Sequence, residues 1–165
     1  MRPTRLRPLA ALCAAALALS GTAGAQVVIS QVYGGGGNSG APLRNDFIEL
    51  YNAGPTAISL ATYSVQYASS TGSTWNRTNL TGTLQPGQYY LVQQAAGTNT
   101  AAAALPTPDA IGTIAMSGTA GKVALVANQT ALTGACPGTP DGVLDFVGFG
   151  GANCSETAPT AALSN

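Results

Sequence analysis

The side chains that could do chemistry in this chain of 165 residues are few, and they include no histidine. Serine is plentiful, but a serine nucleophile needs an adjacent base, and histidine is the usual one. Metal-dependent phosphodiester hydrolysis would need clustered carboxylates and a general base in one cleft. The sequence contains no such cluster, so we expect no catalytic residue, no metal and no cofactor.

Two pairs of acidic residues come closest to a catalytic arrangement. Asp46 and Glu49 lie three apart on a predicted strand, where they point to opposite faces, and we expect Asp46 to be solvated at the strand entry. Asp141 and Asp145, four apart across a turn, meet the same objection. A calcium site built from loop acids and carbonyls stays open as an alternative, although no spacing resembles an EF-hand.

The segment 35–40 reads Gly-Gly-Gly-Asn-Ser-Gly and formally matches the G-x-G-x-x-G dinucleotide fingerprint. That mechanism needs a helix to open at the last glycine, so that its N-terminus faces the pyrophosphate. Here the chain continues through Pro42 into another predicted strand. We therefore interpret the segment as a flexible loop between strands and not as a phosphate site.

Residues 1–25 have the three zones of a secretory signal peptide. Three arginines precede an apolar run over 9–19, and small residues end at Ala25, which predicts cleavage between Ala25 and Gln26 and a secreted, extracellular domain over 26–165. An uncleaved anchor is the alternative, but the run is too short to span a bilayer. The remaining three cations and six anions give a formal net charge of −3. Nothing predicts a phosphate-binding surface or direct nucleic-acid binding by this domain.

Two cysteines remain after cleavage, Cys136 and Cys154. Because export places them in an oxidising compartment, we expect a disulfide between them, with two buried free thiols as the alternative. A zinc site is excluded because two thiols and no histidine cannot complete a tetrahedral ligand set.

Aromatic side chains could form a stacking platform for sugars or bases. The candidates are Trp75, Tyr63, Tyr67, Tyr89 and Tyr90. Nothing basic is interleaved with them, so we favour the alternative that most pack the core and rim of a β-structure.

Short segments rich in β-branched and aromatic residues recur about every dozen residues, separated by turn signals. The predicted strands cover 27–33, 47–51, 58–67, 74–80, 88–93, 111–116, 122–126 and 143–149. Residues 95–110 are rich in alanine and proline and predict a loop with one helical turn at most. No window predicts an amphipathic helix, so the pattern favours an antiparallel β-sandwich or barrel.

Several of these strands carry motifs in a characteristic order. They are VVISQVYGGGGNSGAPLRNDFIELYNAG from residue 27, LQPGQYYLVQ from 84, GKVALVAN from 121 and VLDFVGFGGANCSE from 143. Together they resemble the lamin tail domain as it occurs in exported bacterial proteins. The resemblance implies an immunoglobulin-like antiparallel β-sandwich without catalytic residues of its own. It also implies a place ahead of the catalytic domain of a secreted nuclease.

The sequence departs from the family pattern at its C-terminal end. Domains of this family continue with a further strand where this sequence stops at Asn165. We expect a sandwich that lacks its last strand, or one that closes differently. A missing strand would leave an unpaired edge with few charges to protect it, at which the domain would self-associate.

Three functions are weighed from the sequence. The first is an accessory or binding module whose partner is a catalytic domain of the same parent protein or a component of the cell surface. The second is a complete, stand-alone structural or adhesive domain at the cell surface. The third, a hydrolase in its own right, is disfavoured by the missing histidine and acid cluster.

Overall fold

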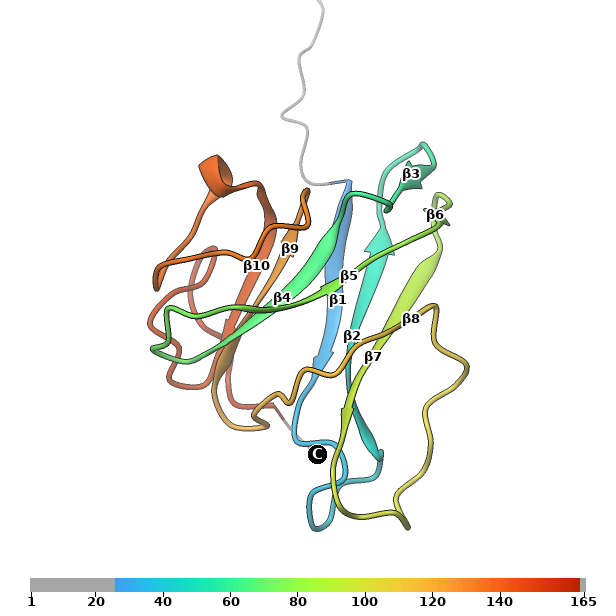
Figure 1. Cartoon of the computed structure of the whole chain (residues 1–165), viewed down its shortest axis with the longest axis vertical. Coiled ribbons are helices and arrows are strands. Elements are labelled where there is room, and N and C mark those ends of the chain that lie inside the picture. The colour runs from blue at the N-terminus through green and yellow to red at the C-terminus, as the bar shows by residue number, and fades with distance from the viewer. Residues whose placement is uncertain (1–25, 164–165) are drawn as a thin grey trace, which may run out of the picture.

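The computed structural model describes residues 26–163, so the predicted signal segment 1–25 lies outside the described residues. Two four-stranded sheets face each other (Figure 1). The first sheet, in spatial order, consists of β1 (Val27–Tyr33), β2 (Asn45–Asn52), β7 (Tyr89–Ala96) and β8 (Ala110–Ile111). The second consists of β10 (Val143–Phe149), β9 (Gly121–Val126), β4 (Ser64–Ser69) and β5 (Asn76–Asn79).

A small third sheet pairs β3 (Ile58–Ser59) with β6 (Thr83–Leu84), and one 3₁₀ turn, η1, covers Thr139–Asp141. Every strand pair is antiparallel except β7 with β8. The predicted immunoglobulin-like antiparallel sandwich is therefore confirmed.

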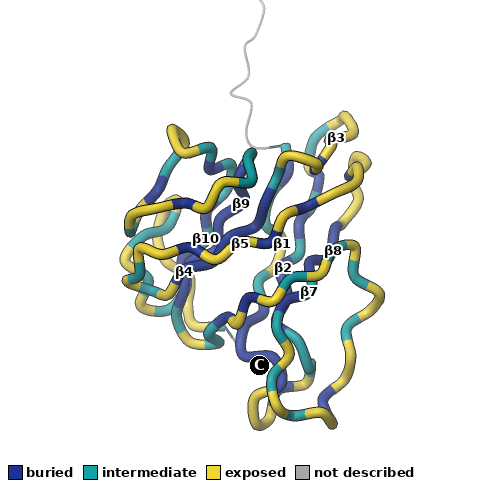
Figure 2. Tube along the Cα trace, viewed as in Figure 1, coloured by how far each residue is buried: buried dark blue, intermediate teal, exposed yellow. Residues whose placement is uncertain are grey.

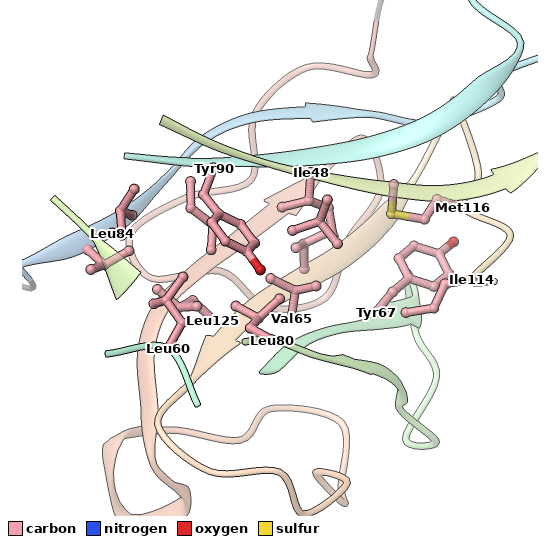
Figure 3. Packing of buried hydrophobic residues seen from close by; sticks show 14 of the residues in the cluster. Ile48, Leu60, Val65, Tyr67, Leu80, Leu84, Tyr90, Ile114, Met116 and Leu125 are labelled. Atoms are coloured by element: carbon pink, nitrogen blue, oxygen red, sulfur yellow. The ribbon is translucent and has the colours of Figure 1, made fainter. Parts of the chain in front are cut away.

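The alternation of side chains along each strand decides what enters the core. Ile48 and Leu50 on β2 are fully buried, whereas Glu49 between them is partly exposed on the opposite face. Figure 3 shows Ile48 and Tyr90 directed from the first sheet toward Val65 and Leu125 of the second. These side chains form the main hydrophobic core between the sheets, and Figure 2 marks the buried stretches of the chain in dark blue.

The two sheets differ in what lies on their outer faces. A second hydrophobic cluster, which includes Trp75, Leu132 and Phe146, lies against the outer side of the second sheet. The segment 127–138 is held across that side by Gln66, whose amide donates to the Thr130 carbonyl and accepts from the Leu132 amide. All six residues of β9 are buried as a result.

Two predicted strands are wrong in extent. The predicted strand over 58–67 is divided between β3 and β4, and the one over 111–116 is reduced to β8. After Ile111 the segment still runs beside β7 but is no longer a regular strand, since the amide of Ile114 binds the side-chain oxygen of Gln94 in place of a strand carbonyl. Residues 97–109 form a loop, as predicted.

The glycine-rich loop between β1 and β2 is packed, which corrects the expectation that it is flexible. Gly34 to Gly37 are buried, and the backbone runs so close to β2 that a Cβ on Gly36 would lie 2.2 Å from the carbonyl carbon of Asn45. A side chain at this position would overlap backbone that cannot move aside. The loop therefore depends on glycine for close approach and not for binding a phosphate.

The loop closes around the carboxylate of Asp46, which is 4% exposed. One carboxylate oxygen accepts from the Gly36 amide at 2.6 Å and the other from the Met116 amide at 2.7 Å. Burial raises the pKa of Asp46, and these amide hydrogen bonds partly oppose the rise. The expectation that Asp46 is solvated at the strand entry is wrong, because the folded loop supplies the hydrogen bonds that water would have made.

We predict that Gly36→Ala lowers the free energy of unfolding by about 1–3 kcal/mol or more, since the new methyl group displaces backbone and disturbs the bonds to Asp46. Gly151→Ala is the matched control, because a Cβ there meets nothing within 4 Å and its backbone is not left-handed. Urea denaturation of both variants measures the difference. Equal stability of the two would contradict the packed loop.

Candidate binding surfaces

Most carboxylates of the domain are engaged in holding backbone. The side chain of Asp141 accepts from the Gly138 amide within η1, and that of Asp109 accepts from the Leu91 amide. Glu49 accepts from the hydroxyl of Ser30. Among residues 26–163, no group of three or more histidine, cysteine, aspartate or glutamate residues could hold a metal ion.

Asp145 and Glu156 are the two acidic residues that the fold brings together. A hydrogen bond from the protonated Glu156 to the Asp145 carboxylate, followed by burial and the charge of Asp145, raises the pKa of Glu156. Asp145 also accepts from the Ile29 amide at 2.6 Å, which joins β10 to the edge strand of the other sheet. From the sequence we considered Asp141 as the partner of Asp145 and disfavoured that pair. The contact with Glu156 was missed because it depends on how residues 150–155 turn back.

A cleft of about 340 Å³ lies beside this carboxyl pair. Its walls are residues 136–139 on one side and 154–156 on the other, with β10 as the floor. The disulfide between Cys136 and Cys154 joins the two walls, which confirms the predicted pairing.

Lys122 lies behind the same walls and is completely buried. Its ammonium group donates to the Ala135 carbonyl at 2.7 Å, the Gly72 carbonyl at 2.8 Å and the side-chain oxygen of Asn153 at 2.9 Å. It also lies 5.6 Å from the ring centroid of Trp75, a cation–π distance. Burial lowers the pKa of Lys122, yet three oxygen acceptors solvate the charged form.

The ammonium and the disulfide act on neighbouring residues. Ala135 precedes Cys136, and Asn153 precedes Cys154, so both ends of the cross-link also bind Lys122. Lys122 is one of the three cations of residues 26–165, and its residue type alone gave no sign that it is buried. The only cations that the described residues leave outside the core are Arg44 and Arg77.

The outer face of the first sheet is the main uncovered apolar surface. Tyr89 is 60% exposed and Ile111 is 69% exposed, and Tyr89 packs on Tyr51 across the strand pair with ring centroids 4.8 Å apart. Of the aromatic candidates from the sequence, Trp75, Tyr67 and Tyr90 are buried and Tyr63 is partly buried. The preferred core interpretation is thus confirmed for most of them, and Tyr51 is the member that the sequence analysis missed.

We call this surface the tyrosine face and define it by Val28, Tyr51, Tyr89, Leu91 and Ile111. The register places Val28, Tyr51 and Tyr89 in one row across three strands, and alternation puts Leu91 on the same side of β7. The face carries no cation, which distinguishes it from a phosphate-binding surface.

Comparison with known proteins gives one family. The model of the Lamin Tail Domain matches residues 20–147, which is well over half of the chain. No curated protein matches the sequence. Within the described residues there is no helix of the length and apolarity that a membrane span requires.

Replacing Lys122 tests the buried ammonium. We predict that Lys122→Met lowers the free energy of unfolding by about 2–4 kcal/mol, because three buried oxygen acceptors lose their donor. Arg77→Met, which removes an exposed cation, serves as the control and should change stability by less than about 0.5 kcal/mol. Thermal and urea unfolding under oxidising conditions measure both, and equal effects would contradict the assigned role of Lys122.

Glu156 predicts a pH dependence with a definite sign. Because its pKa is raised in the folded state, the folded protein binds the proton of Glu156 more tightly than the unfolded chain does, and the stability that this proton confers disappears as the pH rises through the folded pKa. We therefore expect the stability difference between the wild type and Glu156→Gln to shift against the wild type as the pH rises from about 4 to 7. Asp46, raised in the same direction, remains in both proteins and cancels. A stability difference between the two proteins that does not change with pH would contradict the raised pKa of Glu156.

Proposed function

The chain belongs to the lamin tail domain family, and we propose that it serves as a non-catalytic accessory module of an exported protein, carried ahead of the catalytic domain of a nuclease. The family is one of immunoglobulin-like domains without catalytic machinery. In this proposal the module holds its catalytic neighbour, or the whole protein, against another surface.

The observation that carries the proposal is the tyrosine face. The second sheet has a segment of its own chain across its outer side, whereas the first sheet leaves Tyr89 and Ile111 in contact with solvent. Exposed tyrosine is enriched in protein interfaces, where its ring is buried and its hydroxyl keeps a polar partner. A binding role therefore fits this face better than it fits the cleft beside the disulfide, whose carboxylates are already hydrogen-bonded.

The charge distribution supports a module that does not bind nucleic acid by itself. Lys122 is enclosed, so Arg44 and Arg77 are left to oppose six acidic residues. Neutralising several phosphates takes a cluster of exposed lysine or arginine side chains, and two cations on different elements do not make one. Contact with the nuclease substrate would come from the catalytic domain.

Two observations support the exported context. The first 25 residues have the pattern of a secretory signal, and the disulfide between Cys136 and Cys154 is of the kind that persists in oxidising compartments. In a reducing cytosol the same two cysteines would be kept as free thiols.

The proposal predicts that purified residues 26–165 cleave neither plasmid DNA nor a phosphodiester dye with Mg²⁺, Mn²⁺ or Ca²⁺ above a buffer blank. Turnover that co-purifies with the folded protein and vanishes in Asp145→Asn would overturn the non-catalytic assignment. The coding sequence beyond Asn165 separates the accessory module from a stand-alone domain at the cell surface. An open frame leading into a hydrolase domain supports the module, and an immediate stop codon supports the stand-alone domain.

A further inference from the structure

The two large sheets end in four edges, at β1, β8, β10 and β5, and contacts from elsewhere in the chain reach those of β1 and β10. At the edge of β1, the amide of Ile29 donates a hydrogen bond to the side-chain carboxylate of Asp145 on β10. The edge of β10 is covered by the segment around Thr160, which donates to Gly148 and accepts from Gly150. On the other side of the first sheet, residues 109–114 bond to β7 along most of its length.

The edge of β5 is treated differently. Its ladder partner is β4, and just before it Thr74 pairs with Thr133, so the stretch 76–79 alone is left without a neighbour on its outer side. Among residues 26–163, no backbone hydrogen bond joins residue 77 or 79 to anything beyond that ladder. The strand contains no proline and no bulge, and its protection is limited to its short length and the charge of Arg77.

The register shows which backbone groups are free. The amide of Leu80 donates to the carbonyl of Tyr63, so these two residues form a hydrogen-bonded pair. In an antiparallel ladder such pairs alternate, which makes 65 with 78 and 67 with 76 the next hydrogen-bonded pairs. The N–H and C=O groups of Arg77 and Asn79 therefore point away from β4.

We propose that β5 pairs antiparallel with β5 of a second copy of this chain, about a two-fold axis at Thr78. In this register Arg77 lies opposite Asn79 of the partner subunit. The two-fold axis generates a second, equivalent pair between Asn79 and the partner's Arg77. Because the free groups belong to Arg77 and Asn79 on both copies, each pair closes two hydrogen bonds, and four join the dimer. The two second sheets then form one continuous sheet across the interface.

The side chains of β5 favour a second copy as the occupant. Arg77 and Asn79 are both exposed on the outer face, whereas Thr78 points inward and bonds to Gln94. Opposite residues of an antiparallel pair share a face, so the guanidinium group meets a neutral amide and the two arginines are only diagonal neighbours. The strand is thus complementary to itself and carries no like-charge clash.

A groove of about 360 Å³ beside the edge is lined mostly by polar residues, and Ile111 is its one large apolar side chain. Arg77, Thr78 and Asn79 line one side of it, and Ile111 to Thr113 line the other. The exposed side chain of Ile111 lies at its rim, where the second copy would shield it from water. Two short strands bury little surface, so the dimer is weak and depends on protein concentration.

Proline substitution separates the dimer from the fold. Arg77→Pro removes an N–H that faces outward and leaves the bonds to β4 intact, whereas Thr78→Pro removes one that β4 needs. Sedimentation equilibrium of residues 26–165 between about 10 µM and 1 mM should show a monomer–dimer equilibrium. Arg77→Pro should be monomeric throughout with an unchanged Tm, and Thr78→Pro should lower the Tm. A wild type that stays monomeric to the highest concentration overturns the proposal.

Charge substitution at Asn79 tests the register. Asn79→Glu places a carboxylate opposite Arg77 of the partner subunit twice in each dimer and should tighten association about 2- to 30-fold, an effect that salt weakens. Asn79→Lys places like charges opposite each other and should loosen it by a similar factor. Association that persists in Arg77→Pro, or that responds equally to the two Asn79 variants, places the contact elsewhere and overturns the β5 pairing.

Discussion

Burying a charged group is costly unless the protein supplies the hydrogen bonds that water would have made. This domain buries one carboxylate and one ammonium group, and each is solvated by uncharged partners and not by the other. Asp46 takes amides from the glycine-rich loop and from Met116, and Lys122 takes oxygens from three separate loops. The two charges therefore fix the loops that surround the sandwich.

The consequences of Lys122 extend to the cleft and the disulfide. Its acceptors at 135 and 153 are the chain neighbours of Cys136 and Cys154, so the cross-link and the ammonium hold the same two walls. A loss of either would leave the other to hold both walls alone. We therefore interpret the cleft as the gap between two segments that are held together by the disulfide and by Lys122, and not as a ligand-binding site.

The unequal covering of the two sheets connects the fold with its proposed role. The segment 127–138 covers the outer face of the second sheet, whereas the tyrosine face of the first sheet is exposed to solvent. A domain of the lamin tail family has no chemistry to perform, so its surfaces are what it can offer to other molecules. The tyrosine face and the edge of β5 belong to different sheets but meet at Ile111, so a second copy paired on β5 would cover one end of the tyrosine face.

Local patterns in the amino-acid sequence predicted most strands of the core and the disulfide, and the resemblance to the lamin tail domain favoured a sandwich over a barrel. Side-chain alternation has a period of two residues and is written locally, so Ile48 and Leu50 could be assigned to the interior without a structure. The disulfide could be predicted because two cysteines remain after cleavage of the signal peptide and export places them in an oxidising compartment. The limits of this reasoning appeared at 58–67 and 111–116, where long-range contacts broke patterns that looked continuous.

The environment of each buried charge depends on contacts between residues that are far apart in the sequence. Asp46 lies next to Met116, which is 70 residues away, and Lys122 lies next to Gly72, which is 50 residues away. The same holds for Glu156, whose partner Asp145 is reached through a turn, and for β5, whose free edge depends on what packs beside it. The pKa of a group and the exposure of an edge depend on neighbours in space. Residue types and local spacing do not encode those neighbours.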